Sequence, residues 1–367
     1  MRAVLGLLRR GLAVGVRSAL GGPERGLAEA AAEDRRVAGP GAGGNDVQVL
    51  GVGTHSRWVD LDGPVHYLDF GGPASGPMLV CIHGLAGSAV NWSAIAPALT
   101  GTCRMLAVDL PGHGLTQSQR RGTGMPAMHA LLHRFIETVR TGPVILVGNS
   151  MGGMISLLEA SAAPAAVAGV VLIDPVLPLV PAVPDHYVTP MLAAYAVPVL
   201  GPLLMRRRRR QSPEDLVGSI LSLCCVDTSR VPAGVLTQHV TIARQALSLP
   251  ETEQQISASA RSMIAIFAGD LLGGAYRRAI SSITCPVLLL HGTRDRLVPI
   301  TVARAAAHVN PAWTMIEVPG VGHVPQLEAP DDTASAIIGW LGSAGQPAAQ
   351  AATPAPGPPA PAAAEPA

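Results

Sequence analysis

A serine between two glycines is the strongest chemical signal in the sequence. Ser150 lies in the run Gly148-Asn149-Ser150-Met151-Gly152, directly after an apolar stretch and before a helix-length segment. This order matches G-x-S-x-G, in which a serine occupies a sharp turn between a strand and a helix. The first turn of that helix also offers free backbone N–H groups to a developing oxyanion. The pattern predicts a nucleophilic serine.

Two further residues complete this chemistry. Asp295 lies in the polar stretch HGTRDRLVP and His323 in GVGHVPQLEAP, and each stretch follows an apolar run. A serine hydroxyl is a poor nucleophile unless a neighbouring base takes its proton. Histidine suits that task near neutral pH, and a carboxylate on its other ring nitrogen fixes the tautomer. The chain order Ser150, Asp295, His323 is the order expected when the serine lies on such a turn.

A second aspartate competes for the role of the acid. Asp174 follows the apolar run 167–173 and could supply the carboxylate in place of Asp295. Asp295 is favoured because it lies in a polar loop suited to projecting a side chain. Asp174 precedes Pro175 and is also explained as the start of the next segment. Three other histidines are interpreted as structural: His83, His113 and His291.

Short apolar runs alternate with helix-length segments in the body of the chain. The runs are nearly continuously apolar, as strands covered on both faces are. They occupy residues 78–82, 105–110, 143–147, 167–173, 286–290 and 313–318. Helices are expected over 91–99, 125–140, 151–163, 300–309 and 331–342. The alternation predicts a mostly parallel α/β sheet with helices on both faces, and the alternating run 65–70 predicts an antiparallel strand at its start.

One connection is too long for a single crossover helix. Residues 175–284 separate two expected strands, whereas a whole βαβ unit takes about 30 residues. We expect a helical cap over the carboxyl ends of the strands, where ligands bind in such sheets. Within it, the uncharged stretch 188–205 contains three prolines. That stretch is therefore interpreted as an apolar roof over Ser150 rather than as a membrane span.

With these features the chain resembles the α/β-hydrolase family, specifically its capped serine hydrolases. The resemblance rests on GNSMGG at 148–153, on HGLAGS at 83–88 and on DLPGHG at 109–114, and it covers residues 64–342 except for the cap. It implies an α/β-hydrolase fold with the cap inserted before the penultimate core strand. Relatives that act on haloalkanes or epoxides carry an aspartate at the elbow, where this chain has Ser150.

The resemblance also implies roles for individual residues. Ser150 would be the nucleophile, His323 the general base and then the acid, and Asp295 the residue that orients the imidazole. The backbone N–H groups of Leu85 and Met151 would form the oxyanion hole. No cofactor and no metal ion are expected.

Composition divides the chain into five segments. The hydrolase core is expected over 45–174 and 285–343, with the cap over 175–284. Residues 1–44 are interpreted as an amphipathic segment and a linker, and 344–367 as a disordered tail rich in alanine and proline. Residues 1–25 and the run Arg206 to Arg210 are two places where peripheral contact with an anionic membrane stays open as an alternative.

The remaining composition excludes several classes of protein. A formal net charge of +1 gives no global field to attract nucleic acid. Five cysteines at scattered spacings support neither a zinc site nor a disulfide framework, so a reducing compartment, the cytoplasm, is expected.

The function expected is cofactor-independent hydrolysis of carboxylic esters, with apolar or lipid-like acyl groups. Two alternatives stay open. The same triad could act on a carbon–carbon bond, a lactone or a peracid, or the chain could be a hydrolase-fold binding protein without catalytic activity.

Overall fold

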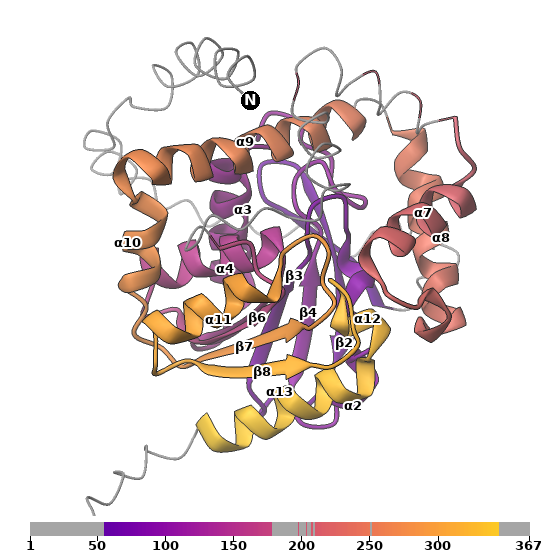
Figure 1. Cartoon of the computed structure of the whole chain (residues 1–367). Coiled ribbons are helices and arrows are strands. Elements are labelled where there is room, and N and C mark those ends of the chain that lie inside the picture. The colour runs from indigo at the N-terminus through magenta and orange to yellow at the C-terminus, as the bar shows by residue number, and fades with distance from the viewer. Residues whose placement is uncertain are drawn as a thin grey trace, which may run out of the picture. The chain divides into compact units, whose positions relative to one another are not determined.

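The computed structural model describes residues 55–177, 210–249 and 252–344, together with residues 197, 203 and 207. Within these residues, the strands form one sheet in the order β1-β2-β4-β3-β5-β6-β7-β8 (Figure 1). Their bounds are β1 (Ser56–Asp60), β2 (Pro64–Gly71), β3 (Met78–Ile82), β4 (Arg104–Val108), β5 (Val144–Asn149), β6 (Val167–Ile173), β7 (Val287–Gly292) and β8 (Thr314–Val318).

The sheet is mostly parallel, as predicted. Strand β2 pairs antiparallel with both β1 and β4, whereas all pairs from β4 across to β8 are parallel. Strands β5 and β7 are buried at every residue, which explains their continuous apolar runs. Two expected strands started one residue early, at Pro143 and Pro286, because proline has no N–H to donate to the ladder.

Helices cover both faces of the sheet. Successive strand residues point to opposite faces, so Ile82 and Leu146 belong to one core while Cys81 and Val147 belong to the other. The first core is covered by α3 (Met125–Val139), α4 (Met151–Ala162), α10 (Ala275–Ser281) and α11 (Ile300–Val309). The second is covered by η2 (Ala89–Trp92), α2 (Ala96–Leu99) and α13 (Pro330–Ala344) (Figure 1).

The insertion between β6 and β7 is helical where it is described. It contains α7 (Pro213–Cys224), η3 (Thr228–Arg230), α8 (Ala233–Ser248), α9 (Thr252–Gly273) and α10. Helices α7 and α8 lie together (Figure 1) and share a small apolar core with the short helix α12 (Pro325–Glu328). Helix α9 is attached to the start of α3, where Ser262 Oγ accepts the Met125 N–H at 2.9 Å.

Several sequence expectations lie outside the described residues. They are the amphipathic segment and linker 1–44, the tail beyond residue 344, nearly all of the stretch 188–205 and most of the arginine run Arg206 to Arg210. That the inserted helices form a lid over Ser150 stays a prediction. Among the described helices, none has both the length and the apolar character needed to cross a bilayer.

Candidate active site

Ser150 lies on a strained turn between β5 and α4. Its backbone angles are φ 55° and ψ −117°, in a region that residues with a side chain rarely adopt. Its N–H donates to Ile173 O at 3.0 Å, so the turn stays attached to strand β6. The flanking glycines are required, since a Cβ on Gly148 would lie 2.5 Å from Gly152 O and a Cβ on Gly152 would lie 2.1 Å from Ile82 O. The half-buried serine therefore stands at the carboxyl edge of the sheet.

The glycine-rich turn after β3 lies against this serine. A Cβ on Gly84 would be only 3.1 Å from Ser150 Cβ, so the backbone passes directly beside the serine. His83 holds that turn, because its Nδ1 donates to Gly84 O at 2.8 Å and its Nε2 accepts the Leu110 N–H at 3.1 Å. Burial lowers the pKa of His83, which fits this neutral structural role. The next residue in the turn is Leu85, one of the two expected oxyanion donors.

The second expected donor is Met151, the first residue of α4. The N–H groups in the first turn of a helix have no partner within the helix, and the positive end of the helix dipole lies there. Ser150 O accepts from Gly153 and Met154, which leaves the Met151 N–H outside that pairing. The location suits an oxyanion hole.

His323 and Asp295 form a buried hydrogen-bonded pair. His323 Nδ1 donates to Asp295 Oδ2 at 2.7 Å, and the two residues are 6% and 9% exposed. The other oxygen, Oδ1, accepts the N–H groups of Leu297 and Val298 at 2.7 and 3.1 Å. Burial opposes ionisation of Asp295, but the charge and the hydrogen bond of His323 outweigh it and lower the pKa of Asp295. An ionised carboxylate on Nδ1 leaves Nε2 free to accept a proton.

A side chain that the sequence did not single out joins this pair to the serine turn. Asn149 Nδ2 donates to Ile173 O at 3.0 Å and to His323 O at 3.1 Å. The residue next to Ser150 is thus bonded to the backbone of the histidine. The structure therefore brings together the three segments that carry Ser150, Asp295 and His323.

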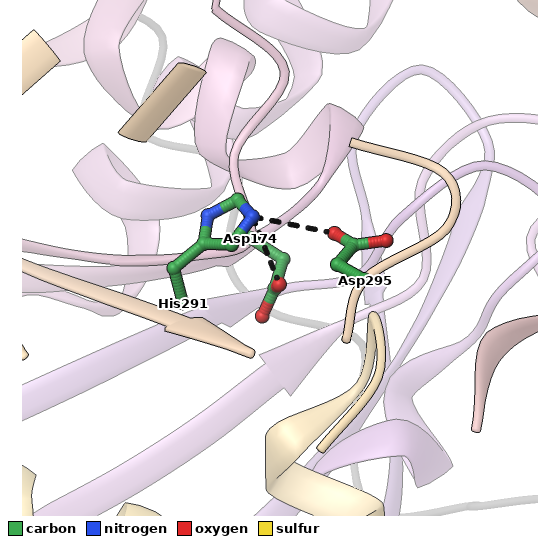
Figure 2. Close-up of side chains that lie close together, drawn as sticks. All are labelled: Asp174, His291 and Asp295. Atoms are coloured by element: carbon green, nitrogen blue, oxygen red, sulfur yellow. Dashed lines mark ion pairs between the residues drawn. The ribbon is translucent and has the colours of Figure 1, made fainter. Parts of the chain in front are cut away.

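Asp174, the rival acid, occupies a different position in the same cluster. Its Oδ1 accepts the Gly292 N–H at 3.0 Å, and its Oδ2 is buried. His291 Nε2 lies 3.4 Å from Asp174 Oδ1 and 3.5 Å from Asp295 Oδ2 (Figure 2). Burial, followed by the charge of Asp295, raises the pKa of Asp174 well above its usual range. Burial therefore favours the protonated form of Asp174, whereas the acid bonded to His323 is Asp295.

These three side chains also have the spacing of a metal site. Ligand atoms of Asp174, His291 and Asp295 all lie within 4.8 Å of one another. However, the nitrogen of His291 that faces the carboxylates is Nε2, and it contacts Val298 O at 2.9 Å. A nitrogen that donates to a carbonyl carries a proton and has no lone pair for a metal ion. The raised pKa of Asp174 favours its protonated form, which lowers the repulsion between the two adjacent carboxyl groups.

Another buried acid organises the turn after β4. Asp109 accepts the Ala89 N–H at 2.6 Å and the Leu115 N–H at 2.8 Å. It also accepts a hydrogen bond from His66 Nδ1 at 2.7 Å. Burial opposes its ionisation, but the charge and hydrogen bond of His66 prevail and lower the pKa of Asp109. In the same turn, burial and the nearby His83 lower the pKa of His113 to about 3. In both His83 and His113, burial disfavours the charged imidazolium.

The family model described as "Alpha/beta hydrolase family" matches residues 79–336, which is more than half of the chain. The chain belongs to the α/β-hydrolase family. This hydrolase is 31% identical to the magnesium-chelatase 30 kDa subunit of Rhodobacter capsulatus over 283 residues, covering 74% of this chain and 88% of that protein. It is 26% identical to the pimeloyl-[acyl-carrier protein] methyl ester esterase of Xanthomonas oryzae pv. oryzae (strain MAFF 311018) over 271 residues, covering 73% and 96%.

Solved structures agree on the fold. A thermophilic esterase from Thermogutta terrifontis superimposes with a TM-score of 0.57 at 23% sequence identity, covering 79% of this chain and 98% of the esterase. At that identity the likeness concerns the fold alone.

Proposed function

We propose that this hydrolase cleaves carboxylic esters through an acyl-enzyme on Ser150. The observation that carries the proposal is the strained serine turn, bonded through Asn149 to a loop whose His323 donates to Asp295 at 2.7 Å. The similarity to an enzyme named as a methyl ester esterase supports an ester as the substrate. No cofactor is needed for this reaction.

The chemistry follows from the atoms at the site. His323 Nε2 takes the proton of Ser150 Oγ as the oxygen attacks the ester carbonyl. Asp295 stabilises the imidazolium that forms, and the N–H groups of Leu85 and Met151 donate to the oxyanion. The imidazolium then gives its proton to the departing alcohol. A water molecule, activated by the same imidazole, hydrolyses the acyl-enzyme and releases the acid.

An apolar acyl group is the substrate class that fits best. Leu85, whose N–H is proposed for the oxyanion hole, has an apolar side chain that is only half-buried. The uncharged stretch 188–205 of the insertion adds to this expectation from the sequence. A binding region of this kind favours acyl chains over charged acids.

Covalent labelling and a chain-length series test the proposal together. A fluorophosphonate probe should label the wild-type chain, and p-nitrophenyl esters should be cleaved faster as the acyl chain lengthens from acetate. Ser150→Ala and His323→Ala should each lower ester turnover by roughly four to six orders of magnitude. Ser161→Ala is the matched control, because Ser161 lies in the same helix and its hydroxyl bonds that of Ser282 at 2.7 Å.

Each competing function predicts a different result. If the probe labels Ser150 but the enzyme prefers a dienone acid, a lactone or a peracid as substrate, the same residues act on a different type of bond. A wild-type chain that neither labels nor hydrolyses any of these substrates would be a binding protein, and the ester proposal would fall.

A second candidate function is favoured by one specific similarity. The relative at 31% identity is named as a subunit of a magnesium chelatase and is covered over 88% of its length. We propose as the alternative that this chain serves such a chelatase as a subunit. The chain should then co-purify with a reconstituted chelatase, or raise the rate of that chelatase when it is added. Ser150→Ala separates the two candidates, because a subunit that does not need hydrolysis keeps its effect in this variant.

A further inference from the structure

Glu328 connects two segments that are far apart in the sequence. It ends α12, and its side chain is completely buried. Its Oε1 accepts the N–H groups of Val226 and Asp227 at 3.0 and 2.8 Å, in the segment between α7 and η3. Its Oε2 accepts the Gly322 N–H at 2.8 Å, in the loop that carries His323. One carboxylate thus accepts from three backbone donors on two segments.

The backbones of these segments are also in direct contact. The His323 N–H donates to Cys224 O at 2.7 Å, at the end of α7. A Cβ on Gly322 would lie 2.2 Å from Cys224 O, so no side chain fits between the loop at Gly322 and the end of α7. We call residues 224–227, residues 322–323 and Glu328 the clasp.

Apolar packing supports the clasp from behind. Val324 and Leu327, on either side of Pro325 in the sequence, are buried in one cluster with Val217 and Leu221 of α7. Arg230 adds a charge at its edge, with Nη1 3.3 Å from Gly320 O and 3.9 Å from Glu328 Oε1. Helix α7 and the histidine loop are therefore held together by hydrogen bonds, by close backbone contact and by packing.

The clasp includes His323, the proposed general base. His323 is bonded to Cys224 through its N–H, to Asn149 through its carbonyl and to Asp295 through Nδ1. Only the first of these contacts depends on the insertion between β6 and β7. A general base must lie within hydrogen-bond reach of the proton that it takes, and a displacement of about 1 Å lowers a rate by about 100-fold.

We propose that Glu328 is a positioning residue that couples helix α7 to His323, so that the insertion between β6 and β7 sets the alignment of the catalytic base. The effect on rate rests on the proposed function, because it requires His323 to be the base. The carboxylate does not touch the substrate in this scheme. It fixes the position of the loop that carries His323 relative to the turn that carries Ser150.

Glu328→Gln tests this coupling with little change in shape. One oxygen remains as an acceptor, but an amide N–H₂ replaces the other and faces a backbone donor. We expect kcat for a p-nitrophenyl ester to fall by about 10- to 100-fold while KM changes by less than about 2-fold. Glu317→Gln is the matched control, because Glu317 lies on β8 with an exposed partner, Arg304, and should leave both constants unchanged.

Hydrogen exchange gives a readout that does not need catalysis. In Glu328→Gln the amides of residues 224–230 and 320–328 should exchange faster than in the wild-type chain, and Glu317→Gln should leave them unchanged. Arg230→Gln, at a half-exposed position, is a milder second variant in case Glu328→Gln does not fold. It should accelerate exchange in 320–328 and lower kcat by about 3-fold.

The outcomes separate the two proposals. Faster exchange together with a lower kcat and an unchanged KM supports the coupling. Unchanged exchange, or faster exchange with an unchanged kcat, overturns it while ester hydrolysis by Ser150 stands. If the wild-type chain neither labels nor hydrolyses, the proposed function fails, and the exchange data alone decide whether Glu328 joins the two segments.

Discussion

Replacing Asp295 with asparagine removes the charge beside His323 while keeping the shape of the side chain. Asp295 Oδ1 accepts two backbone N–H groups, from Leu297 at 2.7 Å and Val298 at 3.1 Å. Only an oxygen can accept them, so the amide oxygen of Asp295→Asn should stay there. The amide N–H₂ then faces His323 Nδ1, which must accept rather than donate. The ring proton moves to Nε2, the nitrogen that should receive the proton of Ser150.

The magnitude follows from this change of tautomer. A histidine with its proton on Nε2 cannot act as the base, and the equivalent change in a serine protease triad costs about 10⁴-fold in kcat. At about 1.4 kcal/mol for each factor of ten, this is about 5.5 kcal/mol of lost transition-state stabilisation. Asp174→Asn should behave differently, because burial raises the pKa of Asp174 and His323 is bonded to Asp295. We expect its activity to stay within about 3-fold of the wild type.

The assay compares kcat/KM of the wild type, Asp295→Asn and Asp174→Asn on one p-nitrophenyl ester near neutral pH. Circular dichroism and thermal unfolding serve as the control for folding. Equal losses in the two variants would refute the assignment of Asp295 as the acid that orients His323. So would an Asp295→Asn enzyme that retained more than about a tenth of the wild-type activity.

Two further predictions concern stability. Gly152→Ala should lower the free energy of unfolding by about 3 kcal/mol or more, because the new Cβ would lie 2.1 Å from Ile82 O and 2.7 Å from His83 O. A loss of less than about 0.5 kcal/mol, measured by urea unfolding, would contradict this close approach. Because the pKa of Asp174 is raised in the folded state, its stabilising contribution is complete below its usual pKa of 3.8 and is lost as the pH rises toward the folded-state value. Asp174→Asn should therefore gain stability relative to the wild type as the pH rises above about 4, and a stability difference that does not change with pH would contradict a raised pKa.

The central sheet could be predicted because its strands are buried on both faces. Strands covered by helices leave long apolar runs, and all six of those runs overlap parallel strands of the structure or, in β4, a strand with one antiparallel neighbour. Strand β1 left no such run. Its residues Arg57 and Trp58 are exposed at the edge of the sheet, so burial in the core does not require them to be part of an apolar run.

The sequence pointed to residue types for a candidate site but not to the contacts between them. Ser150, Asp295 and His323 stand out because few residue types perform this chemistry. The choice between Asp295 and Asp174 depends on how β6 and β7 pair, with Ile173 opposite Leu290, and no local pattern shows that register. Asn149 and Glu328 were missed because their partners are backbone groups, which every sequence has.

The strain at Ser150 can be measured separately from its chemistry. At φ 55° and ψ −117° a residue with a Cβ is strained by about 1–3 kcal/mol, whereas glycine adopts these angles freely. Ser150→Ala and Ser150→Gly both lack the hydroxyl, so both should be inactive, and they differ only in the Cβ. After about 0.5–1 kcal/mol for the greater freedom of glycine in the unfolded chain, Ser150→Gly should be more stable than Ser150→Ala by about 1 kcal/mol.

Urea unfolding of the two inactive variants, with m-values compared to confirm the same denatured state, measures that difference. Strain at this position is useful only because it presents the hydroxyl at the edge of the sheet, beside Gly84 and the loop of His323. A glycine variant that is no more stable than the alanine variant would mean that the turn relaxes in solution. The serine would then lose the fixed position from which His323 could activate it, and the proposed mechanism would lose its geometric basis.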